Sequence, residues 1–184
     1  MLEQMNFSNA SIPVTSVLNS IDTVNFGGLD LQPSYQRGYV WKTDFKDKLI
    51  YSIVKFYPTG NISVRVLTSP NAKGAKSEVV DGQQRLTTLV ILLNTLAKFI
   101  KTGKKNLIEN YIKKEKVFKF SYGDTSGNSY RFFMKNIIGE SNTLPYTPTI
   151  YTANLDRASL FFDEKFNKLT SKELNEFKEK LLTA

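Results

Sequence analysis

Cysteine and histidine are both absent from the 184 residues of this chain. Without them, no Ser-His-Asp or Cys-His triad can form within the chain, and no zinc site can be built from Cys and His ligands. A nuclease that uses a histidine general base is excluded for the same reason. Disulfides cannot form either, which suits a reducing cytoplasm. Any catalysis by this chain must therefore use carboxylates, amides, hydroxyls, lysine, arginine and a hard metal ion such as Mg²⁺.

Long apolar runs are also missing. The longest, at residues 89–100, is interrupted by Asn94, Thr95 and Lys98, so it is too short and too polar to span a bilayer. Residues 1–6 contain no basic segment leading into an apolar run, and we expect no signal peptide. Hydrophobic residues make up 41% of the chain and charged residues 23%, as in ordinary globular proteins. These features predict a cytoplasmic protein with no membrane partner.

Positive charge is in excess. Lys and Arg number 25 against 17 Asp and Glu, which gives a formal net charge of +8. Basic domains often bind nucleic acid, nucleotides or anionic membrane surfaces. Eight lysines lie between residues 98 and 119, a stretch that is either an ordinary solvated face or a nucleic-acid contact. The lysines that we assign to the nucleic-acid contact are Lys101, Lys104, Lys105, Lys113 and Lys114.

Apolar spacing predicts an α+β domain in the first part of the chain. Phe45, Leu49, Ile53 and Phe56 repeat at helical spacing, after Thr43 as the expected N-cap. The elements expected here are strands at residues 29–31, 62–67 and 77–80, and helices at residues 44–57 and 83–101. The second helix has an apolar face formed by Leu86, Leu89, Val90, Leu93, Leu96, Ala97 and Ile100.

A mainly helical region is expected after this domain. Residues 117–120 alternate like a strand, and residues 130–138 fit either a strand or a helix. A helix is expected at residues 151–168. Thr170 and Glu173 have the spacing of a capping box, which starts a last helix. The predicted division is an N-terminal extension (1–25) with a short helix at residues 12–21, the α+β domain (26–101), and a basic hairpin with helices (102–184).

A polar turn, Asp81-Gly82-Gln83-Gln84-Arg85, separates the third expected strand from the second helix. Gly82 allows a sharp turn, and the first N–H groups of the helix lack partners, so this end can bind an anion. Arg85 is unfavourable for the helix dipole and suggests an anionic partner. Gln83 and Gln84 can hold a phosphate oxygen or orient a water, and Asp81 can bind Mg²⁺ or activate that water. The simpler alternative is a plain capped helix, with Asp81 as N-cap and Arg85 in a surface salt bridge.

A second group of polar and aromatic residues follows the first expected strand. Arg37 offers a planar fork for a phosphate group. Tyr35, Tyr39 and Trp41 can stack on a base or pack in the core, and packing is the favoured interpretation for the last two. A loop after one strand and a turn after another can lie side by side in a small sheet. Arg37 and Arg85 are therefore expected to form a two-arginine phosphate clamp.

The motifs L-x-P-x-Y-Q-R-x-Y-V-W and E-V-V-D-G-Q-Q-R-L-T-T-L resemble the N-terminal DGQQR domain of GmrSD-type restriction proteins. The resemblance covers about residues 29–99, and Asn154, Leu155, Phe161 and Phe162 look like a weaker helical motif of the family. It implies a ParB- or sulfiredoxin-like small mixed sheet with flanking helices. It also implies binding and hydrolysis of a nucleoside triphosphate, coupled to the cutting of modified foreign DNA. Family members usually continue further, so we expect a fragment whose HNH-type nuclease domain or subunit lies outside this chain.

The resemblance implies a catalytic set made up of Asp81, Gln83, Gln84 and Arg85. The nucleotide-binding residues that we add to it are Tyr35, Gln36, Arg37, Gly82, Thr87 and Thr88. In this hypothesis the γ-phosphate lies on the helix amides, the two arginines neutralise developing charge, and Asp81 holds Mg²⁺ or helps to activate the attacking water. Two alternatives stay open: a nucleic-acid-binding module, and a regulatory domain that binds a nucleotide without turnover.

Overall fold

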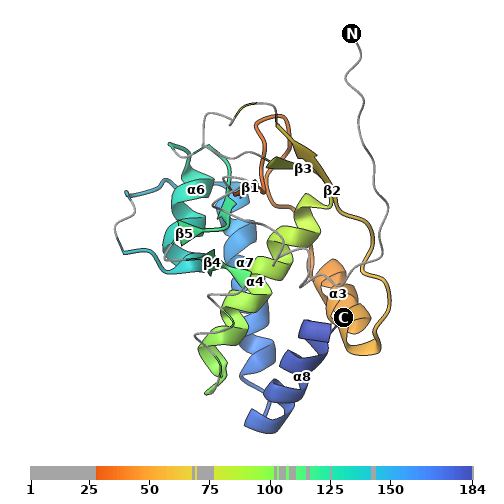
Figure 1. The fold of residues 1–184 in the computed structure, drawn as a ribbon. Coiled ribbons are helices and arrows are strands. Elements are labelled where there is room, and N and C mark those ends of the chain that lie inside the picture. The colour runs from red at the N-terminus through yellow and green to blue at the C-terminus, as the bar shows by residue number, and fades with distance from the viewer. Residues whose placement is uncertain are drawn as a thin grey trace.

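The computed structural model describes residues 28–67, 69, 77–101, 103, 107, 111–114, 117–124, 126–141 and 144–183 (Figure 1). Its helices are α3 (Thr43–Lys55), α4 (Gln83–Phe99), α6 (Asn128–Phe132), η1 (Phe133–Ile138), α7 (Ile150–Phe166) and α8 (Ser171–Thr183). Its strands are β1 (Leu29–Asp30), β2 (Ser63–Val66), β3 (Ser77–Asp81), β4 (Lys113–Lys114), β5 (Val117–Phe118) and β6 (Phe120–Ser121). The helix expected at residues 12–21 lies outside these residues.

A small mixed sheet has the strand order β2-β3-β1-β6. The central strand β1 is parallel to both of its neighbours: Leu29 pairs with Ser77 of β3 and with Phe120 of β6. Strand β2 is antiparallel to β3 and forms an edge. This arrangement confirms the expected α+β class with a small mixed sheet and flanking helices, whereas the ParB-like assignment stays a prediction.

The strand expected at residues 117–120 is divided between two sheets. β5 pairs with β4 in a separate antiparallel ribbon, and β6 joins the main sheet. Lys119 lies at the crossing point, where its N–H donates to the carbonyl of Ile112 (3.0 Å) and its carbonyl accepts from Leu29 (2.9 Å). The chain therefore leaves the ribbon and enters the main sheet within one residue, which alternation alone does not reveal.

Helix α4 is the centre of the hydrophobic core. Every residue of its expected apolar face is buried, and so are Ile91 and Leu92, which lie outside that face. A helix that is apolar all round must be covered on all sides. Its neighbours include α7, α8 and η1, and α4 and α7 run side by side through the middle of the molecule (Figure 1). One cluster of buried side chains extends from Leu29 to Leu181, across the predicted boundary after residue 101. The division into regions stays a prediction.

Helix α3 packs through a narrower stripe than its spacing predicts. Leu49 and Ile53 are buried, but Phe45 and Phe56 are 47% and 56% exposed. Helical spacing therefore does not place these two phenylalanines in the core. Among the described elements, α3 has its main contacts with α7 and α8, and the partly buried Ile50 and Val54 pack beside Leu49 and Ile53.

The ends of α3 also differ from the expectation. Its N-cap is Lys42 rather than Thr43, and no side chain caps it. The helix ends at Lys55, where Phe56 adopts a left-handed backbone with φ of 56° and donates its N–H to the carbonyl of Ile53. This is the usual way to end a helix, although glycine is the usual residue. Asp44 lies in the first turn, as expected.

The last part of the described chain is helical. Residues 130–138 fall in α6 and η1, which resolves the open choice in favour of a helix. The capping box of α8 is confirmed: Glu173 donates its N–H to the Thr170 hydroxyl (3.3 Å), and the Thr170 N–H donates to Glu173 Oε2 (2.8 Å). Across the residues that the structure describes, we find no helix with the length and apolar character that a bilayer crossing needs.

Candidate functional site

The polar turn begins at the end of β3. Asp81 is the last residue of that strand, and Gly82 is the N-cap of α4 with φ of 84°. Asp81 as N-cap, the simpler alternative for this turn, is therefore wrong. The Leu86 N–H donates to the carbonyl of Gly82 (2.9 Å), which closes the first turn of the helix. The N–H groups of residues 83–85 precede this bond and have no acceptor in the described part of the chain.

A solvent-open cleft of about 330 Å³ lies at this end of α4. Because β1 and β3 are parallel neighbours, the loop after β1 and the turn after β3 leave the sheet at the same edge. The structure thereby brings most of the expected site residues together. The residues that line the cleft are Gln36, Arg37, Trp41, Val80, Asp81, Gly82, Gln83, Gln84 and Arg85.

The two arginines of the cleft differ in how they are held. The Arg85 guanidinium donates to the carbonyl of Asn61 and lies against Gly60, where an added Cβ would come within 2.8 Å of Nη2. The expected surface salt bridge of Arg85 is not formed with any described carboxylate. Arg37 is exposed, and its guanidinium has no partner within the described ranges. Arg85 is therefore fixed in place, whereas Arg37 is available to a ligand.

Three side-chain amides hold the backbone of residues 37–40, and we call them the amide clamp: Gln83, Gln84 and Asn154. Gln84 accepts from the Val40 N–H (2.8 Å) and donates to the Gly38 carbonyl (3.2 Å). Gln83 and Asn154 donate to the carbonyls of residues 37 and 39, at 3.2 and 3.0 Å. Within the described part of the chain these four residues belong to no helix or strand, so the three side-chain amides serve as partners for their peptide groups.

The amide clamp changes the interpretation of the two glutamines. We expected their amides to hold a phosphate oxygen or orient a water. In the structure these amides bind the backbone that carries Arg37, so their direct role is to position that segment. Sequence reasoning missed the third member, Asn154, which was noted only within a weak motif. Its bond joins residues 115 positions apart, which local spacing does not reveal.

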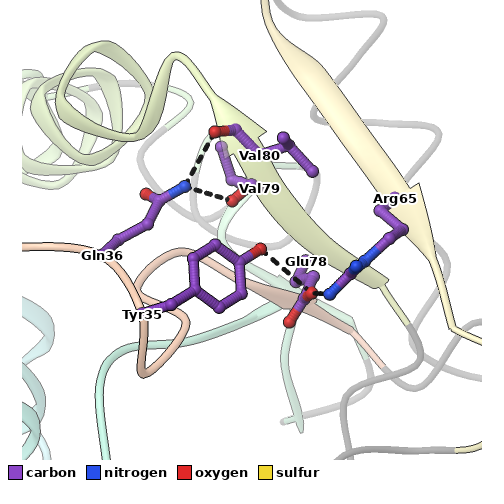
Figure 2. Close-up of polar contacts among 6 residues, drawn as sticks. All are labelled: Tyr35, Gln36, Arg65, Glu78, Val79 and Val80. Atoms are coloured by element: carbon purple, nitrogen blue, oxygen red, sulfur yellow. Dashed lines mark hydrogen bonds and ion pairs between the residues drawn. The ribbon is translucent and has the colours of Figure 1, made fainter.

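The start of the loop, at Tyr35 and Gln36, is hydrogen-bonded to strand β3 (Figure 2). Gln36 donates to the carbonyls of residues 79 and 80, at 2.9 and 2.8 Å. The Tyr35 hydroxyl donates to Glu78 Oε1 (3.0 Å), and the same carboxylate forms an ion pair with Arg65. Burial and the bond to Glu78 raise the pKa of Tyr35, so the phenol stays protonated as a donor. Tyr35 does not line the cleft and acts as a support for it. Sequence reasoning did not single out Glu78 or Arg65.

Two of the expected nucleotide-binding residues, Thr87 and Thr88, lie in the core rather than in the cleft. Thr87 and Thr88 are fully buried and do not line the cleft. Thr88 donates to the Gln84 carbonyl (2.7 Å) and pairs with the Tyr39 hydroxyl (2.8 Å), while burial raises the pKa of Tyr39. Tyr39 is thus a core residue, as favoured. Trp41 differs, because it is partly buried and lines the cleft.

A family model described as the N-terminal domain of the GmrSD restriction endonuclease matches residues 14–184. The chain belongs to this family. The match confirms the resemblance seen in the two motifs and connects the chain with DNA restriction. Searches among curated proteins and among solved structures found no match.

The basic stretch of this GmrSD N-terminal domain is only partly a solvated face. Lys98 pairs with Asp163 (3.9 Å), and Lys119 is buried. Among the lysines assigned to a nucleic-acid contact, Lys101 is exposed, while Lys104 and Lys105 lie outside the described residues. Lys113 and Lys114 form strand β4. Lys101 is not among the described residues that line the cleft.

A magnesium ion is compatible with the cleft. Within the described ranges, no group of three or more Asp, Glu, His or Cys side chains could hold a metal ion. Asp81 is the one carboxylate among the described residues that line the cleft. Mg²⁺ is commonly held by one or two carboxylates together with the phosphates of its substrate. Asp81 could therefore hold such an ion only together with oxygen atoms supplied by water or a bound ligand.

Replacing Gly82 by alanine is expected to destabilise the GmrSD N-terminal domain by more than the backbone strain of about 1–2 kcal/mol that a left-handed alanine carries. The added Cβ would lie 3.0 Å from Ile62 Cγ1 and 3.1 Å from the Asn61 carbonyl. Gly139→Ala is a matched control, because Gly139 has the same φ of 84° and no atom of the described residues lies within 4 Å of the added Cβ. Urea unfolding of both variants measures the difference, and equal losses would contradict the crowding at Gly82.

Proposed function

We propose that the cleft at the N-terminus of α4 binds the phosphate groups of a nucleoside triphosphate. The observation that carries this proposal is the free guanidinium of Arg37 beside a helix end whose first N–H groups lack acceptors among the described residues. Unpaired helix N–H groups and the positive end of the helix dipole favour an anion. The planar fork of an arginine matches two phosphate oxygens.

The charges in the cleft suit a triphosphate with its magnesium ion. Among the described residues of the lining, Arg37 and Arg85 supply two positive charges against the one carboxylate of Asp81. Gly82, with its φ of 84°, lets the chain turn from β3 into α4 at the cleft. The volume of about 330 Å³ is at the small end of the range for ligand sites, so a nucleotide would fill the cleft. Asp81 would hold Mg²⁺, which would supply further charge neutralisation.

Hydrolysis would place different demands on the same residues. The side-chain amides of Gln83 and Gln84 are already bonded to the backbone of residues 37 and 38. These glutamines would therefore act by positioning Arg37 rather than by contacting the phosphates. An Asp81 carboxylate that does not hold Mg²⁺ would instead accept a proton from the attacking water. Family membership supports a role of this domain in a restriction protein, with the nuclease domain or subunit outside the chain.

Calorimetric titration of the chain with ATP, GTP, CTP and UTP, each with and without Mg²⁺, tests the proposal. At least one triphosphate is expected to bind, and more tightly with Mg²⁺. Phosphate release, measured with and without duplex DNA, then separates an NTPase from a regulatory domain that binds without turnover. Absence of binding by all four nucleotides would contradict the proposal. A DNA affinity that falls steeply with salt would instead favour a nucleic-acid-binding module.

A further inference from the structure

Trp41 is the single tryptophan of the chain, and it lies at the end of the segment that the amide clamp holds. It is partly buried against the core and also lines the cleft. Its ring stacks on that of Phe45, with centroids 5.6 Å apart and an interplanar angle of 22°. Phe45 in turn has the Lys48 ammonium 5.8 Å from its ring centroid. An ordered aromatic pair is thus placed at the surface beside the cleft.

Core packing accounts for only part of the surface of this pair. Tyr39, two residues earlier, shows what packing looks like here: it is fully buried and its hydroxyl is paired with Thr88. Phe45, by contrast, is 47% exposed, so the Trp41–Phe45 pair buries much less of its surface than a core pair would. Aromatic surface held in place next to a cleft is typical of a ligand-binding position.

The lining of the cleft combines two kinds of surface. Arg37, Arg85 and the end of α4 suit phosphate groups, whereas Trp41 and Val80 supply the apolar surface. Trp41 is the one aromatic side chain among the described residues of the lining. A nucleotide has the same two kinds of surface, since it joins a charged phosphate chain to a flat base.

We propose that Trp41 stacks on the base of the nucleotide whose phosphates bind at Arg37 and the N-terminus of α4, an inference that rests on the proposed function. Phe45 holds the indole ring in position from its other side. Stacking uses the face that every base presents, so Trp41 adds affinity for all four bases and little preference among them. The size of the effect is roughly 5- to 150-fold in affinity, as for other bases stacked on aromatic side chains.

Two magnesium-containing probes separate the base from the phosphates: inorganic triphosphate, and the nucleoside triphosphate that binds most tightly. Trp41→Ala is expected to weaken the nucleotide roughly 5- to 150-fold and to leave inorganic triphosphate nearly unchanged. Trp41→Phe keeps a flat ring and is expected to restore most of the loss. Because the chain has one tryptophan, its fluorescence in the unaltered protein is expected to change with the nucleotide and not with inorganic triphosphate.

Tyr51→Ala is the matched control, since Tyr51 is a 55% exposed aromatic residue on α3, the helix that carries Phe45, and does not line the cleft. It is expected to bind both probes normally. If the unaltered protein binds both probes equally and Trp41→Ala changes neither, the stacking role is wrong and the phosphate site stands. If Trp41→Ala weakens both probes alike, Trp41 only supports the cleft, which also overturns the stacking role. If neither probe binds the unaltered protein, the proposed function itself fails.

Discussion

Replacing Arg37 by alanine is expected to raise the dissociation constant for the nucleoside triphosphate roughly 10- to 150-fold, the loss of one strong charge-assisted interaction. The fold should stay intact, because the Arg37 guanidinium is exposed and has no partner in the described part of the chain. Its removal leaves no buried group unsatisfied. Calorimetric titration measures the affinity, and thermal unfolding checks that the melting temperature is unchanged.

Two further variants sharpen this test. Arg37→Lys keeps the charge but loses the planar fork, so an intermediate affinity is expected. Arg85→Ala should also weaken binding, but with a lower melting temperature, because Arg85 holds the Asn61 carbonyl and packs on Gly60. Nucleotide affinity that is unchanged in both alanine variants would show that the cleft does not bind phosphate groups.

The second large effect is expected for Gln84→Ala. This change leaves the Val40 N–H and the buried Gly38 carbonyl without their partner. Unsatisfied groups of this kind cost about 1–3 kcal/mol each, so the free energy of unfolding should fall by about 2–4 kcal/mol after partial rescue by water. Nucleotide affinity should fall as well, because the segment that carries Arg37 loses its main attachment. Urea unfolding and calorimetric titration of the same variant measure the two effects.

Asn94→Ala provides the matched control. Asn94 also lies on α4 and donates its side-chain amide to a backbone carbonyl, that of Ile137, but it does not line the cleft. It should lower stability without a specific loss of nucleotide affinity at temperatures where the protein is folded. If Gln84→Ala and Asn94→Ala reduce affinity equally, the amide clamp does not position the site. A Gln84→Ala variant as stable as the unaltered protein would show that the clamp bonds contribute nothing.

The sequence predicted those elements whose structure is set by residues a few positions apart. The apolar face of α4, the turn at Gly82 and the capping box at Thr170 and Glu173 all follow from spacing and residue type within a few positions. The meeting of Arg37 and Arg85 was also foreseeable, since loops after neighbouring parallel strands leave the sheet at one edge. The phosphate role of that edge remains a prediction that the binding experiments address.

Features set by distant partners could not be read from spacing. The side-chain amide of Gln84 bonds equally well to a phosphate or to a peptide group, and only the fold brings the Val40 N–H to it. Phe45 has helical spacing like that of Leu49, but its exposure depends on how many elements cover α3. Lys119 belongs to a lysine-rich stretch and is nevertheless buried, because the chain enters the main sheet at that residue.

The two-residue strand β1 also sets the order in which the protein can assemble. Leu29 completes the sheet by pairing with Ser77 and Phe120, both far along the chain. Such distant parallel pairs form slowly, because closing the intervening loops costs chain entropy before the new contacts contribute any stabilisation. Helix α4 needs only local bonds and can form early. A chain emerging from the ribosome therefore cannot complete the sheet around β1 until residue 121 has been made.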